Sequence, residues 1–203
     1  GVWDESRVRE ASEVRAEAQK KGLKAHFGAI CELCMEKGSE LPEGHPNRKF
    51  KGRAVFLGNQ VQDESFNWAE CAELGSNPPC MEAARFCDAL GCIEDYEVLN
   101  GDAKSAYTQS FLEGPPTWVS IPKHRWPPEW HGKYRNPVCP LVLALYGHPD
   151  SGGCWEEKCD KEMKAVGFKP ICWEWPGVYW HEDFKALLIV YVDDFKLAAR
   201  QKD

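Results

Sequence analysis

The feature that most restricts this chain is a short apolar run that ends in two adjacent aspartates. Residues 186–192 are apolar, and Asp193 and Asp194 follow directly. Seven residues cannot span a bilayer, which needs about 20, and an apolar run of this length is typical of a buried strand. Two carboxylates beside a buried strand are costly unless a cation neutralises them.

The two aspartates predict a turn in the chain. Adjacent residues on a regular strand point to opposite faces, so both carboxylates can approach one ion only if the chain turns. We therefore predict a β-hairpin turn over residues 191–194, with carboxylate oxygens of the kind that Mg²⁺ prefers. The alternative is an Asp-Asp turn that faces water.

A third carboxylate follows another predicted strand. Residues 96–99 have strand character, and Gly101 and Asp102 come soon after them. At the end of a neighbouring strand, Asp102 would join Asp193 and Asp194 in a two-metal site for in-line phosphoryl chemistry. The alternative is that Asp102 is a turn residue after Gly101.

The composition excludes several classes of protein. The chain has 203 residues, 43% hydrophobic and 12% aromatic, which excludes a disordered chain. It has no apolar run of 18 residues and no segment like a secretory signal. We therefore expect an intracellular protein, in a cytoplasmic particle or in the nucleus, with no membrane partner.

The charge is negative overall but uneven along the chain. A net charge of −7 argues against a broad basic surface of the histone kind. The densest basic stretch holds Arg48, Lys49, Lys51 and Arg53. This stretch is either a solvated loop or a finger that contacts phosphates.

The ten cysteines favour reduced thiols that act as small buried hydrophobes. Cys31 and Cys34 form a CxxC pair, with His45 eleven residues further on. A zinc site needs a second ligand pair at short spacing, and none follows. A zinc-binding interaction module at these residues is therefore a minor alternative.

The remaining patterns predict a mixed fold. Helical spacing appears over residues 4–21, 81–90 and 151–167, and strand character appears over 54–57, 178–180 and 186–191. Strands and helices do not alternate strictly, so we expect an α+β fold with an antiparallel sheet.

Five blocks in a fixed order resemble one protein family. The chain has KGRAVFLGNQ at 51–60, DAKSAY at 102–107, LYG at 145–147 with Trp155 eight residues on, GF at 167–168 and YVDD at 191–194. These blocks resemble, in order over about residues 48–200, the reverse transcriptase domain of copia-type long-terminal-repeat retrotransposons. The first 47 residues carry little of this resemblance.

The resemblance implies a right-hand polymerase fold. We expect a palm, with a four-stranded antiparallel sheet and helices on one face, plus a fingers lobe. The fingers would be about residues 46–78 and 118–145, the palm about 79–117 and 146–203, and residues 1–45 an N-terminal helix and leader. Only nine residues follow Asp194, so we expect the thumb to be absent.

The resemblance also implies an activity and its cofactor. A copia-type reverse transcriptase is an RNA-directed DNA polymerase that adds nucleotides to a primer 3′-hydroxyl. Asp102, Asp193 and Asp194 would be the catalytic carboxylates and would hold two Mg²⁺ ions, for which Mn²⁺ can substitute. The partners would be an RNA or DNA template with its primer, deoxynucleoside triphosphates and, in a longer polyprotein, ribonuclease H and integrase domains.

The family pattern further assigns binding roles. Arg53, helped by Lys51, would contact the phosphates of the incoming nucleotide, as the arginine fork suits phosphate. Ala103 and Tyr107 would also line the nucleotide site, and Tyr107 is alternatively a core aromatic. Tyr191 and Val192 would border the primer terminus.

One departure from the family pattern supports an alternative function. Asp150 stands where the family usually has a nucleotide-positioning Gln. It would either contact the nucleotide in place of Gln or cap the helix that starts near Ser151. The alternative function is a catalytically inactive retroelement remnant that binds, at most, nucleic acid or another polyprotein subunit.

Overall fold

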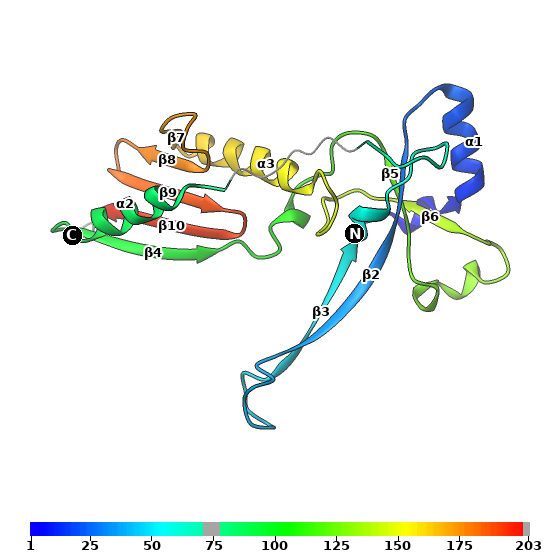
Figure 1. The fold of residues 1–203 in the computed structure, drawn as a ribbon, viewed down its shortest axis with the longest axis horizontal. Helices are drawn as coiled ribbons and strands as arrows, with labels where there is room; N and C mark the ends of the chain where they lie inside the picture. Colours follow the sequence, from blue (N-terminus) through cyan, green and yellow to red (C-terminus); the bar gives the residue numbers. More distant parts are fainter. Residues whose placement is uncertain (71–77, 201–203) are drawn as a thin grey trace. The chain divides into compact units, whose positions relative to one another are not determined.

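The computed structural model describes residues 1–70 and 78–200 and divides into two compact units. The first unit comprises residues 1–73 and 111–151, and the second comprises 74–110 and 152–203. The chain therefore passes between the units three times. Each unit has its own five-stranded sheet (Figure 1).

The sheet of the first unit has the strand order β1-β6-β5-β2-β3. Strands β2 and β5 are parallel and the other neighbours are antiparallel. The strands are β1 (Arg9–Glu10), β2 (His26–Lys37), β3 (Lys49–Phe56), β5 (Thr117–Ser120) and β6 (Pro137–Pro140). The same unit contains short 3₁₀ turns: η1 (Glu5–Arg7) before β1, η2 (Gly58–Gln60) after β3, and η4 (Lys123–Arg125) and η5 (Pro128–Trp130) between β5 and β6.

Both faces of this sheet are covered by apolar side chains. Helix α1 (Ala11–Lys21) packs on one face, where Val14 and Ala18 meet Phe27 and Trp118. The other face holds a second cluster centred on Phe56. A Cβ atom at Gly28 would lie 2.3 Å from the Phe56 ring, so only glycine allows this ring to sit against β2.

The N-terminal region is more than a helix and a leader. A helix was predicted over residues 4–21, but the α-helix starts only at Ala11. The preceding residues form η1, capped by the Asp4 side chain, and then β1, which pairs with β6. Residues 1–45 thus contribute β1, α1 and β2 to the first unit.

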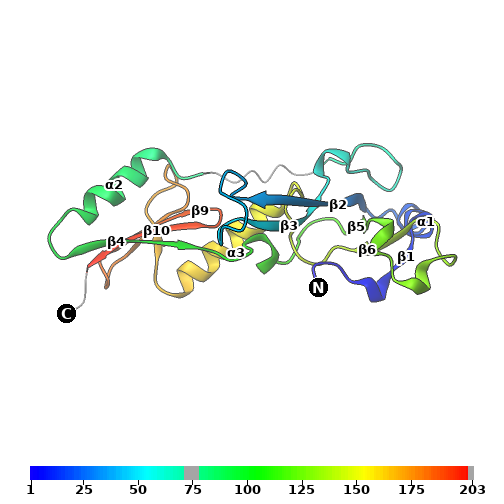
Figure 2. The same ribbon diagram turned by 90° about the horizontal axis from the view of Figure 1, so that it is seen from below.

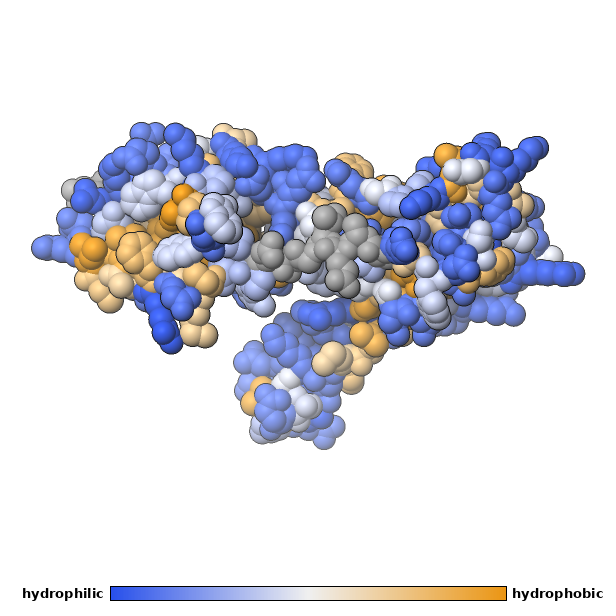
Figure 3. Space-filling model, turned by 45° about the horizontal axis from the view of Figure 1, so that its top comes forward, coloured by the Kyte–Doolittle hydropathy of each residue, from blue (hydrophilic) through white to orange (hydrophobic). Residues whose placement is uncertain are grey.

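Strands β2 and β3 form a long antiparallel hairpin whose tip projects from its unit (Figure 1). Most residues from Leu33 to the end of β2, and the first half of β3, are exposed. Figure 3 shows that mainly hydrophilic residues cover this projection. The basic stretch of the sequence lies here, because β3 begins at Lys49 rather than at the predicted residue 54.

The sheet of the second unit is antiparallel, with the order β4-β10-β9-β8-β7. Its strands are β4 (Tyr96–Asp102), β7 (Lys169–Pro170), β8 (Val178–His181), β9 (Ala186–Tyr191) and β10 (Asp194–Arg200). Helices α2 (Met81–Gly91) and α3 (Ser151–Ala165) confirm the two helices predicted in this region, and η3 (Tyr107–Gln109) follows β4. The α+β prediction is confirmed.

The expected sheet architecture is wrong in two respects. The sheet has five strands rather than four, and its helices lie on opposite faces rather than on one (Figure 2). Leu187 and Ile189 face α2, where they pack with Ala83 and Cys87, whereas Val190 packs toward Trp155 and Cys159 of α3. The cause is β9, which is apolar at every position and therefore needs cover on both faces.

The packing of β9 generates a stability prediction. Leu187 is fully buried between β9 and α2. Leu187→Ala should destabilise the second unit by about 2–5 kcal/mol, since it removes buried methyl groups and leaves a cavity. Urea denaturation followed by circular dichroism measures this loss.

The matched control is Leu99→Ala on the edge strand β4, where Leu99 is 50% exposed. Its loss should be clearly smaller. Equal losses for the two variants would contradict the assignment of Leu187 to the core.

Candidate active site

The apolar run and the two aspartates form a β-hairpin, as predicted. Strands β9 and β10 are joined by a two-residue loop, Val192 and Asp193, and Tyr191 pairs with Asp194 across it. Val192 has a φ of +55°, whereas Asp193 has a negative φ, which is the pattern of a type II′ turn. A β-branched residue at positive φ is strained, so the surrounding structure must hold this turn in place.

The third aspartate lies opposite this turn. Strand β4 pairs with β10 in the register that places Asp102 directly across from Asp194. Cross-strand partners share a face, and their Cβ atoms lie about 4.5–5.5 Å apart. The backbone N–H of Ala103 donates to the carbonyl oxygen of Asp193 at 2.6 Å and fastens the end of β4 to the loop.

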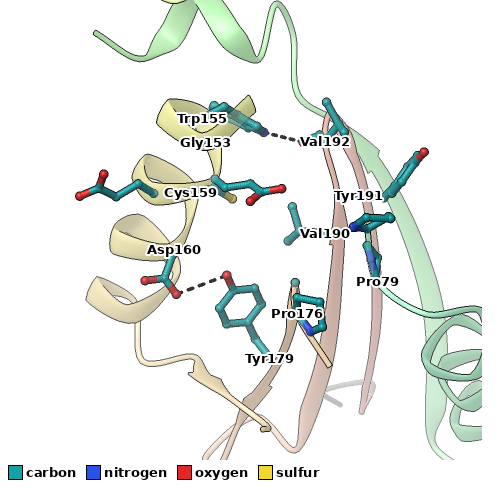
Figure 4. Close-up of a pocket in the computed structure, with 14 residues that line it drawn as sticks. Pro79, Gly153, Trp155, Cys159, Asp160, Pro176, Tyr179, Val190, Tyr191 and Val192 are labelled. Atoms are coloured by element: carbon teal, nitrogen blue, oxygen red, sulfur yellow. Dashed lines mark hydrogen bonds between the residues drawn. The ribbon is translucent and has the colours of Figure 1, made fainter. Parts of the chain in front are cut away.

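Helix α3 fastens the turn from the other side. The indole N–H of Trp155 donates to the carbonyl oxygen of Val192 at 2.6 Å, as Figure 4 shows. Trp155 is buried, and it packs with Cys159 and Ala106. The strained residue of the turn is therefore held by a hydrogen bond from the helix.

A cavity of about 480 Å³ lies between α3 and strands β8 and β9, next to the turn (Figure 4). The Tyr179 hydroxyl donates to Asp160 at 3.4 Å across this space. Burial raises the pKa of Tyr179 and raises that of Cys159 to about 11. Both groups are therefore neutral at physiological pH, and Cys159 is a poor nucleophile there.

Asp102 and Asp194 are exposed at the end of the sheet. Within residues 1–70 and 78–200, neither carboxylate forms an ion pair, and no group of three His, Cys, Asp or Glu side chains is arranged to hold a metal. The nearest basic residue along β10, Lys196, instead pairs with Asp88 of α2 at 2.5 Å. Within the described residues, the two facing carboxylates thus have no protein cation as a partner.

The other predicted residues of this unit surround the turn. Tyr191 is exposed at the end of β9. Ala103 and Tyr107 pack against the cluster of Trp155, which also makes Tyr107 part of the core of its unit. Seven predicted residues therefore belong to one unit: Asp102, Ala103, Tyr107, Tyr191, Val192, Asp193 and Asp194.

Lys51 and Arg53 lie on β3, in the first unit, and both are exposed. Their register partners on β2 are Met35 and Leu33, so both basic residues share one face of the hairpin. The acidic residues Glu32 and Glu36 alternate with these partners and lie on the opposite face. One face of the projecting hairpin therefore carries its positive charge.

Asp150 also belongs to the first unit, and it is only 5% exposed. It directly precedes α3, but its Oδ1 atom has no hydrogen-bond partner among the described residues. Burial raises the pKa of this carboxyl, and His26 opposes the shift. Contact with a nucleotide would require the carboxyl to leave this buried position.

Two histidines lie in the same buried region. His148 accepts from the Asp150 backbone N–H through Nδ1 at 3.2 Å, so its Nε2 carries the proton and faces the Thr117 hydroxyl at 3.2 Å. Burial lowers the pKa of His148 to about 4 and also lowers that of His26. The Nδ1 atom of His26 lacks a partner within the described residues.

The residues of the zinc alternative do not converge. Cys31 and Cys34 both lie on β2, three positions apart, and therefore point to opposite faces of the strand. His45 lies in the loop between β2 and β3. Strand geometry thus separates the two thiols that a shared ion would need.

Sequence reasoning missed two contributions to these regions. Trp155 was predicted on a helix face and in a family motif, but its hydrogen bond to the turn, which joins residues 37 positions apart, was not predicted. The cluster of His26, His148 and Asp150 was also missed. No motif links these three residues. The only indication of the cluster in the sequence was the apolar setting around His148.

The chain was compared with known proteins. No family model matches it, and no curated protein matches it.

The anchor of the turn generates a prediction. Trp155→Phe keeps an aromatic ring but removes the N–H that reaches Val192. We expect the second unit to lose about 0.5–1.5 kcal/mol of stability, the usual net value of one hydrogen bond. Urea denaturation measures this loss.

The control is Trp180→Phe, because the Trp180 N–H donates to the exposed side chain of Glu182 at 2.8 Å. Water can replace that partner, so the loss should be smaller than for Trp155→Phe and come only from the smaller ring, which packs against the core at both sites. A Trp155→Phe variant as stable as this control would contradict the anchoring role.

The buried His148 generates a pH prediction. Its pKa is about 4 in the folded chain against 6.5 for an ordinary histidine, so the unfolded chain binds more protons between these values. Stability should therefore fall as the pH drops from 6.5 to 4, by at most about 3 kcal/mol from this group. His148→Gln should flatten the fall, and His131→Gln, at an exposed site, should not. Identical pH profiles for the two variants would refute this role.

Proposed function

We propose that this chain is an RNA-directed DNA polymerase of the copia-type reverse transcriptase kind. Asp102, Asp193 and Asp194 would be its catalytic carboxylates. The observation that carries the proposal is the register of β4 and β10, which places Asp102 opposite Asp194 beside the turn that holds Asp193. Asp102 and the adjacent pair Asp193 and Asp194, which is distant in the sequence, thus lie at one end of one sheet.

The donor set suits Mg²⁺. Asp102 and Asp194 are exposed, lie on one face and have no cationic partner in the described parts of the chain. Such hard carboxylate oxygens fit this ion, with Mn²⁺ as a substitute. When bound, two such ions would supply electrostatic stabilisation for nucleotidyl transfer. The chain's own task would be to hold these carboxylates in place.

The turn would supply the rigidity that this task needs. The Ala103–Asp193 and Trp155–Val192 hydrogen bonds hold the two-residue loop from β4 and from α3. A residue held at a strained φ and fastened on both sides is a sign of a functional position rather than of ordinary packing. Tyr191 and Val192 would border the primer terminus beside it.

The nucleotide phosphates would be bound by the basic face of the β2–β3 hairpin. Arg53 and Lys51 are exposed on one strand of it, and no acidic residue shares their face in residues 31–37 and 49–55. The arginine fork can bind phosphate oxygens in a bidentate manner. The hairpin would thus belong to a fingers lobe, and the second unit would serve as the palm.

The test is Mn²⁺ binding followed by electron paramagnetic resonance, with and without a deoxynucleoside triphosphate. The wild-type chain should bind Mn²⁺ more tightly when the nucleotide is present. Asp102→Asn and Asp194→Asn should each weaken binding by about tenfold or more, because carboxylate charge sets the affinity of such sites.

The matched control is Asp183→Asn, which changes an exposed aspartate in the turn between β8 and β9 of the same sheet. It should bind Mn²⁺ like the wild-type chain. Equal binding by all variants would refute the carboxylate assignment. A folded wild-type chain that binds no Mn²⁺ would favour the inactive remnant instead.

A further inference from the structure

A second cavity lies in the first unit, on the face of the sheet that α1 covers. It measures about 370 Å³, within the range of about 300–1,000 Å³ typical of ligand pockets. Ala29 of β2 and Ser120 of β5 are register partners and lie side by side at this cavity. Because both side chains are small, they leave room where larger residues would fill the space.

One wall of the cavity is a loop that the fold holds firmly. The Asp63 carboxylate accepts from the backbone N–H groups of Ser65 and Asn67 at 2.8 and 2.9 Å. Arg15 of α1 donates to the Asp63 carbonyl oxygen and, at 3.1 Å, to the Gln62 side chain. Its guanidinium also lies 3.9–4.0 Å from the ring centres of Phe27 and Phe66.

This loop presents Trp68 at the cavity. The backbone of Trp68 forms an isolated antiparallel β-bridge with Gln62, yet Trp68 is 70% exposed. Tryptophan usually stabilises a fold by burying its large apolar ring. An indole left in water gives the fold none of that hydrophobic stabilisation. An exposed indole beside a cavity, on a backbone that is held in place, is suited to stacking on a flat ring.

The polar groups at the cavity suit the edge of such a ring. The side-chain amides of Gln60 and Asn136 are exposed and, in the described residues, make no hydrogen bond within the chain. Amide side chains pair with the donors and acceptors on nucleobase edges. Among the described residues that line the cavity, Arg15 is the only charged one, although the chain as a whole carries −7.

We propose that this cavity binds one unpaired base of a single-stranded nucleic acid. The base stacks on Trp68, and Gln60 and Asn136 bind its edge. The choice of a nucleic acid over a sugar ring rests partly on the proposed function. It rests partly on a lining that, among the described residues, contains one guanidinium and no carboxylate to repel a polyanion. The site belongs to the first unit and is separate from the three aspartates.

The test measures binding of a labelled single-stranded decathymidylate to the whole chain by fluorescence anisotropy. A chelator is present, so that no metal site contributes to binding. Trp68→Ala should weaken binding by about 5- to 150-fold, the value of one stacked base. Trp173→Ala is the matched control, because Trp173 is an 87% exposed indole of the second unit. It should bind like the wild-type chain.

Further variants and a second ligand distinguish a loss of stacking from a loss of folding and from an effect of charge. Trp68→Phe keeps a ring and should retain most of the affinity, and Gln60→Ala should weaken binding less than Trp68→Ala does. An abasic strand of equal length should bind the wild-type chain as weakly as the Trp68→Ala variant binds decathymidylate.

The proposal would be overturned by no binding by the wild-type chain, by equal losses for Trp68→Ala and Trp173→Ala, or by undiminished binding of the abasic strand. Trp68-dependent binding of a neutral oligosaccharide without binding of the oligonucleotide would assign the cavity to sugars and also overturn it. Mn²⁺ binding at the aspartates is measured separately, so failure here would be distinct from failure of the proposed function.

Discussion

The antiparallel pairing of β4 with β10 is the constraint on which the candidate active site depends. It places Asp102 across from Asp194, and the separate pairing of β10 with β9 leaves a loop of only two residues beside them. A slip of one residue would move every side chain of β4 to the other face of the sheet. The Ala103–Asp193 hydrogen bond opposes such a slip at the point where it would matter most.

The two units differ in whether their notable polar groups are exposed or buried. The second unit exposes its central carboxylates at the end of its sheet, where water solvates them. The first unit buries His26, His148 and Asp150 in one region and leaves one atom of His26 and one of Asp150 without a partner within the described chain. Buried groups of this kind are usually satisfied by ordered water, and they make stability depend on pH.

The sequence predicted local structure well where a single physical pattern dominated. The apolar run with two aspartates predicted the hairpin turn, and proline before 81 with glycine at 91 predicted α2. It predicted poorly where long-range pairing decides the outcome. The pairing of β1 with β6 takes up residues before Ala11, so the N-terminal helix starts later than predicted. Which helices cover the two faces of β9 depends on contacts between elements that are far apart in the sequence. The resemblance to reverse transcriptases named the residues around the turn, but only the structure showed Asp150 to be buried.

The three passages of the chain between the units have a consequence for how such a protein can change over time. Neither unit is one uninterrupted stretch of sequence, so no single continuous segment could carry one unit to another gene without part of the other. The two units are therefore inherited together.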